Sequence, residues 1–554
     1  MNKSRLPRIF MATAFVLLTT NISSFAATPL SADAPAVTDE QYVAPAAPGT
    51  GYQGDLVQDS VAISSQNSYY VNFTTAHGTV NEAPTAVTSC TSDKDPGCAF
   101  TVRSQYSAIL PMCSSANSFD CLSAITAKDS SGAPLAVNPI GTFPTDATQG
   151  FTGDPSVNLP SGAVPELVEI PGAPHEGGDQ YIVRVALLGV RDQSNPNSFS
   201  TPTIQASFYA VKTISGIFTN PVIDTNTVDW GNSVLGVKIT NQISPALISP
   251  TQCIVSSATE CAVPLPLPTN VAFGFTLHLQ KQITGWLHGR MKSPQVNIAS
   301  NGAATDLTVS AYPIDVPVDQ AWVANSALPS PLTALYSDGG VHPGSMTAPQ
   351  DFLHINTDYD QAAMNEYLNW LPLFGDKAVA DPIEWTLNSI NNAGNTPSDN
   401  SVNKCLQSNK GLSGIVTTNA TQYFDAPPTF NSATSSLDYK VAAAHFLPDG
   451  TTTFKGTYDL VMASSVARCI YGFTSAPVSA SVSVVSASGA PDVATVVTGE
   501  KDGWLRLGAY NFTFSNPTIS VKLSQNLSIT CVKGKSVKTV SGAHPICPSG
   551  FKKK

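Results

Sequence analysis

Cysteine is the residue type whose chemistry this sequence spaces most clearly. The chain has ten cysteines, and three pairs lie eight residues apart with turn-forming residues between them. This spacing predicts a disulfide across a tight loop. The remaining four cysteines would then close one long loop and the last segment. The predicted disulfides are Cys90–Cys98, Cys113–Cys121, Cys253–Cys261, Cys405–Cys469 and Cys531–Cys547.

Metal binding is the alternative use of these thiols. The sequence contains no C-x-x-C, and Cys531, His544 and Cys547 offer a zinc ion three ligands with no fourth nearby. A catalytic thiol would leave one cysteine unpaired, which the even count disfavours. We therefore expect disulfides, and with them an oxidising compartment.

Lysines form a second group, in the segment ITCVKGKSVKTVSGAHPICPSGFKKK (529–554). This segment has no carboxylate side chain, whereas the whole chain has a formal net charge of −11. Lysines on a disulfide-closed hairpin can contact an anionic polymer or lipid of the cell envelope. The alternative is a basic end that only aids solubility. The candidate envelope-binding residues are Lys533, Lys535, Lys538, Lys552, Lys553 and Lys554.

The stretch WLHGR brings an aromatic ring, an imidazole and a guanidinium together at Trp286, His288 and Arg290. This combination can bind a sugar or a carboxylate, so we predict a candidate ligand-binding site. The alternative is the end of a strand with a structural arginine.

Three further patterns resemble metal sites, and each is incomplete. His175-Glu176 lies in a Pro/Gly-rich loop and lacks a third ligand. His278 and His288 could project from one sheet face, but no carboxylate accompanies them. In NTDYDQAAMNE, Gln361 and Tyr367 occupy the positions at which a calcium loop needs glycine and a carboxylate. Asp358 and Asp360 are better explained as helix-capping residues, and we assign no metal.

Motifs for catalysis are missing from the sequence. There is no G-x-S-x-G, no H-E-x-x-H and no P-loop. Carboxylate pairs of glycoside hydrolases cannot be recognised here, because their separation is a property of the fold. We assign no catalytic residue and no cofactor. The acidic body also argues against nucleic acid as a partner.

The elements that would position these residues are mostly β. Charged residues make up only 12% of the chain, and many segments alternate apolar with Ser or Thr. Ile204, Ala206, Phe208 and Ala210 share one face of a predicted strand, as do Ile519, Val521 and Leu523 of another. Helical spacing occurs over Thr357–Phe374, and a short second helix would begin with Asp381 as its cap.

The predicted fold class is mostly β, with several sandwich domains of immunoglobulin-like type and one short helical insert. The expected organisation is a signal peptide (1–26), an Ala/Pro-rich linker (27–54), a disulfide-stapled β domain (55–175), a β-sandwich domain (176–350), a helical insert (351–400), a second β-sandwich domain (401–525) and a basic, disulfide-closed tail module (526–554).

The first 26 residues predict export. Lys3, Arg5 and Arg8 precede a short apolar run, and Ser24-Phe25-Ala26 provides small residues for cleavage after Ala26. The alternative is an uncleaved anchor, which the shortness of the apolar run disfavours. We therefore expect a secreted protein, extracellular or at the cell surface.

Several stretches resemble a family of secreted actinobacterial cell-surface proteins of uncharacterised function. They are VARCIYGFTSAPVSASVSVV, EKDGWLRLGAYNFTFSNPTISVKL and the tail ITCVKGK…PICPSGFKKK, with looser similarity in TGWLHGRMKSPQV and CSSANSFDCLSAI. The resemblance is strongest over 400–554, and the tail pattern resembles a portable module. It implies residence at the envelope and carries no known activity.

These observations favour a non-catalytic secreted or cell-surface protein, structural or adhesive, that the basic tail retains at the envelope. One alternative is a secreted hydrolase of polysaccharide or peptide, because the middle of the chain is long and without motifs. The other is a module that binds a glycan or a protein through its loops.

Overall fold

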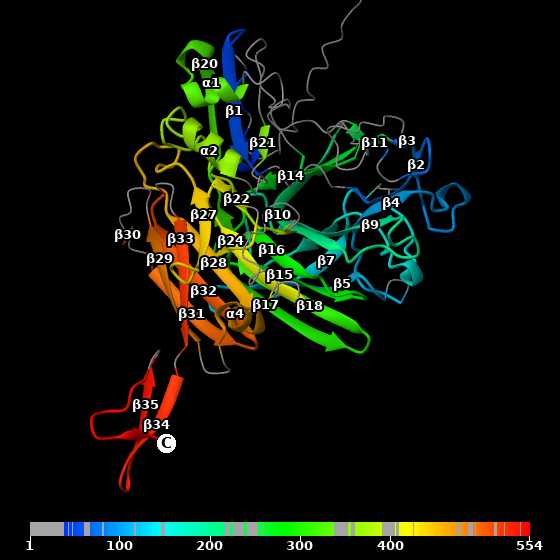
Figure 1. Ribbon diagram of the computed structural model, residues 1–554. Coiled ribbons are helices and arrows are strands. Elements are labelled where there is room, and N and C mark those ends of the chain that lie inside the picture. Colours follow the sequence, from blue (N-terminus) through cyan, green and yellow to red (C-terminus); the bar gives the residue numbers. More distant parts are fainter. Residues whose placement is uncertain are drawn as a thin grey trace, which may run out of the picture.

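A computed structural model provides the fold (Figure 1). It describes residues 38–42, 44–46, 48–59, 67–79, 82, 84–115, 118–145, 150–216, 222–224, 238–240, 253–257, 259–336, 353–355, 361–390, 405, 409–424, 426–473, 478–485, 491–492, 495–514, 518–525, 527–542 and 545–554. The predicted signal peptide lies outside these residues.

The protein is mostly β, as the sequence predicts. Strands account for 53% and helices for 9% of the described residues. A fifteen-stranded sheet runs through the molecule. Its main path is β3 (Pro84–Ser89), β2 (Tyr69–Thr75), β4 (Arg103–Ile109), β9 (Gln180–Asp192), β10 (Thr203–Ser215), β23 (Thr386–Ser389), β16 (Gly285–Arg290), β24 (Leu412–Thr418), β28 (Gly456–Ala463), β32 (Trp504–Phe512) and β31 (Thr495–Lys501), with β7 (Asn138–Thr142), β8 (Glu166–Glu169), β13 (Val255–Ser256) and β14 (Glu260–Leu265) beside it.

Smaller sheets cover this large sheet. The five-stranded sheet contains β17 (Lys292–Asn301), β18 (Ala304–Tyr312), β15 (Ala272–Leu279), β5 (Cys121–Lys128) and β6 (Pro134–Leu135). The six-stranded sheet contains β25 (Gln422–Tyr423), β26 (Thr429–Asn431), β27 (Ser436–Ala442), β33 (Thr518–Gln525), β29 (Val478–Val485) and β30 (Pro491–Asp492).

Shorter elements complete the structure. β20 (Asp319–Ala324), β1 (Tyr52–Gln58) and β21 (Leu353–Ile355) form one sheet, and two-stranded pairs join β11 (Val222–Asp224) to β12 (Lys238–Thr240) and β19 (Ile314–Asp315) to β22 (Ile383–Glu384). The α-helices are α1 (Ser330–Tyr336), α2 (Gln361–Trp370) and α4 (Ser464–Tyr471), and the 3-10 helices are η1 (Asp39–Gln41), η2 (Pro96–Cys98), η3 (Pro155–Val157) and η6 (Asn325–Ala327). None of the described helices is long and apolar enough to cross a membrane.

Two cores lie on opposite faces of the large sheet. On β16, Leu287 belongs to the core shared with the five-stranded sheet, whereas Trp286 belongs to the core shared with the six-stranded sheet. Successive strand residues point to opposite faces, so one strand contributes to both cores. The shared faces predicted for these two strands are confirmed, because each set of residues lies together in one core: Ile204, Ala206, Phe208 and Ala210 in the first, and Ile519, Val521 and Leu523 in the second.

The boundaries expected at residues 175 and 400 do not separate sheets. β4 pairs with β9 across the first boundary, and β16 pairs in parallel with β24 across the second. Both cores therefore draw strands from more than one of the expected units. The sequence pattern gives the face of each strand but does not identify the neighbour that covers it.

Two local predictions are wrong. The expected second helix after Asp381 is replaced by β22 and β23, where Trp385 is fully buried and donates its indole N–H to Ala311 O at 2.9 Å. The expected linker also packs on the protein from residue 38 onward, because Ala44 is buried and Trp322 Nε1 donates to Pro45 O at 2.8 Å. The first helix of the insert is present as α2.

Candidate functional site

The basic tail forms a three-stranded sheet of its own, which extends away from the body below β33 (Figure 1). β34 (Leu527–Lys533) lies between β35 (Ser536–Gly542) and β36 (Lys552–Lys553). β34 and β35 form a hairpin whose turn contains Gly534 at a φ of 58°, a value that favours glycine. The Cys531–Cys547 disulfide ties the segment before β36 to the central strand.

The six tail lysines are all exposed and lie on both faces of this small sheet. Cys531 pairs with Lys538 on one side and Lys553 on the other, so these three residues share a face. Val532 pairs with Lys552, which places Lys552 on the opposite face. Of the ion pairs found among the described residues, none includes a tail lysine.

Apolar side chains accompany these charges. Val537 is 63% exposed and Ile546 is 81% exposed, the two largest values among the exposed large hydrophobic residues of the described chain. The Lys538 ammonium lies 5.1 Å from the centre of the Phe551 ring, a cation–π distance that limits its motion. The module therefore presents constrained positive charge next to exposed apolar groups.

The second predicted site, Trp286, His288 and Arg290, is buried within the large sheet. Each of the three residues is at most 2% exposed. Arg290 Nε donates to Asp59 Oδ2 at 2.6 Å and its Nη2 to Asp59 Oδ1 at 3.0 Å. Its Nη1 donates to the carbonyl oxygens of Thr418 and Ala420 at 3.1 and 2.6 Å.

Aromatic stacking completes this cluster. The His288 ring lies parallel to the Tyr423 ring with 3.8 Å between their centres, and the Arg290 guanidinium lies 4.4 Å from the centre of the same ring. Burial lowers the pKa of His288 well below its usual value and raises the pKa of Glu384 well above its own. Burial alone would lower the pKa of Arg290, but the adjacent Asp59 carboxylate raises it. These contacts fit the alternative reading of WLHGR, a structural arginine at a strand end.

The other candidate metal residues lie apart or are already bonded. His278 belongs to the five-stranded sheet and His288 to the large sheet, so the two do not share a face. His175 accepts from the Gly177 N–H at 3.2 Å, and its Nε2 lies 2.9 Å from Gln180 O. Asp358 and Asp360 lie outside the described residues, as does His544. Within the described ranges, no group of three or more His, Cys, Asp or Glu residues is placed to hold a metal ion.

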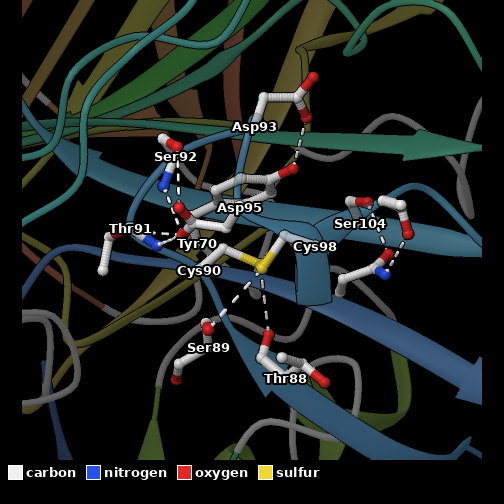
Figure 2. The surroundings of a disulfide bond; sticks show 12 residues. Tyr70, Thr88, Ser89, Cys90, Thr91, Ser92, Asp93, Asp95, Cys98 and Ser104 are labelled. Carbon is white, nitrogen blue, oxygen red and sulfur yellow. Dashed lines mark hydrogen bonds between the residues drawn. A yellow bond between two sulfur atoms is a disulfide. The ribbon is translucent and has the colours of Figure 1, made fainter.

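All five predicted disulfides are present, and the described chain has no free cysteine. Figure 2 shows the surroundings of the first of them, Cys90–Cys98, where two carboxylates also hold the loop. Asp95 accepts from the Thr91 and Ser92 N–H groups at 2.6 and 3.0 Å, and Asp93 accepts from Tyr70 Oη at 2.7 Å. Arg191 Nη2 donates to the same Asp93 oxygen at 2.7 Å. The disulfides indicate an oxidising environment.

One surface residue escaped the sequence prediction. Phe119, which lies inside the Cys113–Cys121 loop, is the one exposed Phe, Tyr or Trp among the described residues. An aromatic residue between two closely spaced cysteines was the available signal. The Phe119 ring stacks on the ring of His278. His278 lies more than 150 positions later in the chain, so this contact could not be predicted.

Comparison with known proteins identifies no relative. No family model, no curated protein and no solved structure matches this chain.

Proposed function

We propose that this protein is a non-catalytic secreted or cell-surface protein, structural or adhesive, and that its basic tail retains it at an anionic surface of the cell envelope. The observation that carries the proposal is the set of six exposed lysines on a disulfide-closed sheet without a carboxylate side chain. Each lysine near an anionic surface contributes about 1 kcal/mol of binding.

The rest of the chain supports the same assignment. Five disulfides suit an oxidising environment outside the cytoplasm, and the predicted signal peptide provides the route of export. The body is acidic overall, so the electrostatic attraction to an anionic surface belongs to the tail.

The test compares two triple variants of the mature chain. K533Q/K535Q/K552Q removes three charges from the tail, and K94Q/K128Q/K501Q removes three from exposed positions of the body. Binding is measured by co-sedimentation with phosphatidylcholine vesicles containing 30% phosphatidylglycerol and with immobilised polygalacturonate. We expect the tail variant to bind about a hundredfold more weakly and the body variant to bind as the wild type does.

The two probes distinguish the source of the anion. Binding to vesicles alone assigns the tail to lipid, and binding to polygalacturonate alone assigns it to an acidic polymer. In cells, deletion of 529–554 should release the protein into the medium, as should washing with high salt. Equal retention of the full chain and the deletion variant would refute the proposal.

A further inference from the structure

A stapled surface loop holds Phe119 in a fixed, exposed position. The Cys113–Cys121 disulfide closes the loop, and Cys113 N donates to Leu122 O at 3.0 Å. Asp120, next to Phe119, is buried at a φ of 50°, an uncommon conformation for a residue other than glycine. Its carboxylate accepts from the Gln280 N–H at 2.9 Å, which ties the loop to the end of β15. Such local strain is retained where the surrounding contacts over-determine it.

One face of the Phe119 ring lies against the imidazole ring of His278. The ring lies nearly parallel to the His278 imidazole, at 24° and 5.9 Å between centres. His278 Nδ1 lies 2.6 Å from Asp306 Oδ1, and Asn301 Nδ2 donates to the other oxygen of Asp306 at 2.9 Å. Three successive contacts therefore fix the ring, while Phe119 as a whole residue stays 43% exposed.

Next to this ring lies the outer face of the five-stranded sheet, which carries hydroxyl and amide groups. His278 and Thr276 share this face of β15, and Thr276 pairs with Thr308, which in turn pairs with Asn297. Their alternating neighbours, such as Phe275 and Val309, are fully buried in the core. The centre of the face is uncharged, and the Asp306 carboxylate is already occupied by His278 and Asn301.

We propose that Phe119 and this sheet face form a binding surface for a neutral polysaccharide. A planar ring with one free face can stack on the apolar face of a sugar ring. Hydroxyl and amide side chains both donate and accept hydrogen bonds, as sugar hydroxyls do. The uncharged centre of the face, with Asp306 and Lys128 towards its ends, complements an uncharged polymer, and the fixed ring loses little conformational freedom on binding.

Depletion isotherms of the full chain on microcrystalline cellulose, chitin and mannan test the proposal. They are measured in 0.5 M NaCl, which screens the tail lysines. We expect binding to at least one of the three polymers, and at least tenfold weaker binding by F119A, because buried aromatic contacts dominate such interfaces. Asn297→Ala, at the far edge of the face, should weaken binding by a smaller factor.

The matched control is I140A. Ile140 is 45% exposed, a value similar to the 43% of Phe119, and it lies on β7, a strand of the large sheet and not of the five-stranded sheet. It should bind as the wild type does, and so should K533Q/K535Q/K552Q, which separates this surface from the proposed function of the tail. Failure of the wild type to bind any of the three polymers would overturn the proposal. Equal affinities of F119A and wild type, or equal losses in F119A and I140A, would do the same.

Discussion

The body and the tail use positive charge in opposite ways. Arg290 is fully buried, and its guanidinium bonds a carboxylate and backbone carbonyls. The tail lysines are exposed, and none of them joins an ion pair of the described chain. A buried positive charge whose hydrogen bonds are all made within the fold is not available to a ligand. An exposed positive charge without a carboxylate partner is available.

This difference predicts different sensitivities. Buried charges make the stability of the body depend on their partners and on pH, because each partner must be in the right protonation state. Exposed charges contribute little to stability, and their attraction to an anionic surface falls as salt is added. The two regions can therefore be studied separately. A change of pH should affect the stability of the body, and added salt should weaken binding by the tail.

Replacement of Arg290 should have the largest effect. Arg290→Met leaves the Asp59 carboxylate, whose side chain is 6% exposed, next to an apolar side chain, and breaking a buried ion pair costs about 3–5 kcal/mol. The free energy of unfolding, measured by urea denaturation, should fall by this amount. D59N/R290M should recover part of the loss, because the double variant no longer buries an unpaired Asp59 carboxylate.

The matched control is Arg468→Met. Arg468 also bonds both oxygens of one carboxylate, that of Glu500, at 2.6 and 3.1 Å, but both side chains are at least 20% exposed. We expect a loss of about 1 kcal/mol or less. Equal losses in R290M and R468M would show that burial does not distinguish these two arginines.

Asp319 should make the stability of the body depend on pH. Its side chain is fully buried, and Tyr367 Oη donates to it at 2.6 Å. Burial raises the pKa of Asp319 to about 7, so the folded protein keeps the proton at pH values where the unfolded chain has released it. The contribution to stability is complete below about pH 4 and is lost between pH 4 and pH 7, on the order of 4 kcal/mol.

Asp319→Asn removes this titration while keeping the shape of the side chain. The unfolding midpoint of the wild type should fall more between pH 4.5 and pH 7.5 than that of D319N. Burial also raises the pKa of Asp459 to about 6, so part of the pH dependence should remain in the variant. Parallel pH profiles for the two proteins would contradict the assignment to Asp319.

Local patterns allowed much of the strand structure and four of the five disulfides to be predicted, whereas Cys405–Cys469, with a sequence separation of 64, followed as the remaining pair. The eight-residue cysteine spacing places both partners on one turn, so it constrains geometry without knowledge of the fold. The alternation of Ile519, Val521 and Leu523 requires only the two-residue period of a strand. Each of these two signals is contained within a single short segment of the chain.

Long-range pairing was not predictable for a physical reason. Asp59 meets Arg290 across more than two hundred residues, and no local pattern in either segment requires the contact. The same holds for β16, whose neighbours β23 and β24 follow it by about a hundred residues. The composition of WLHGR indicated chemistry at these positions, but only the fold determines whether that chemistry faces solvent or core.

The tail was predictable because it is local. Its strands, turn and disulfide all lie within residues 527–554, and its charge can be read from the sequence. The exposure of all six lysines follows from the small size of the module, since three short strands cannot bury long charged side chains.

Single lysine substitutions should have the smallest effect and give the finest test of the contrast. Lys535→Gln in the hairpin turn should weaken binding to vesicles with 30% phosphatidylglycerol by about fivefold, which corresponds to about 1 kcal/mol. The dependence of the logarithm of the binding constant on the logarithm of salt concentration should become shallower by about one unit, because one fewer counterion is released. The urea midpoint of the body should not change.

Lys94→Gln is the control from the body. Lys94 is also exposed, but its ammonium lies 3.9 Å from Asp154, so a neighbouring carboxylate offsets its charge. Its replacement should leave both the affinity and the salt slope unchanged. If K94Q weakened binding as much as K535Q does, attraction would depend on the total charge of the protein. A loss confined to K535Q would locate the attraction in the tail, where positive charge has no carboxylate side chain to neutralise it.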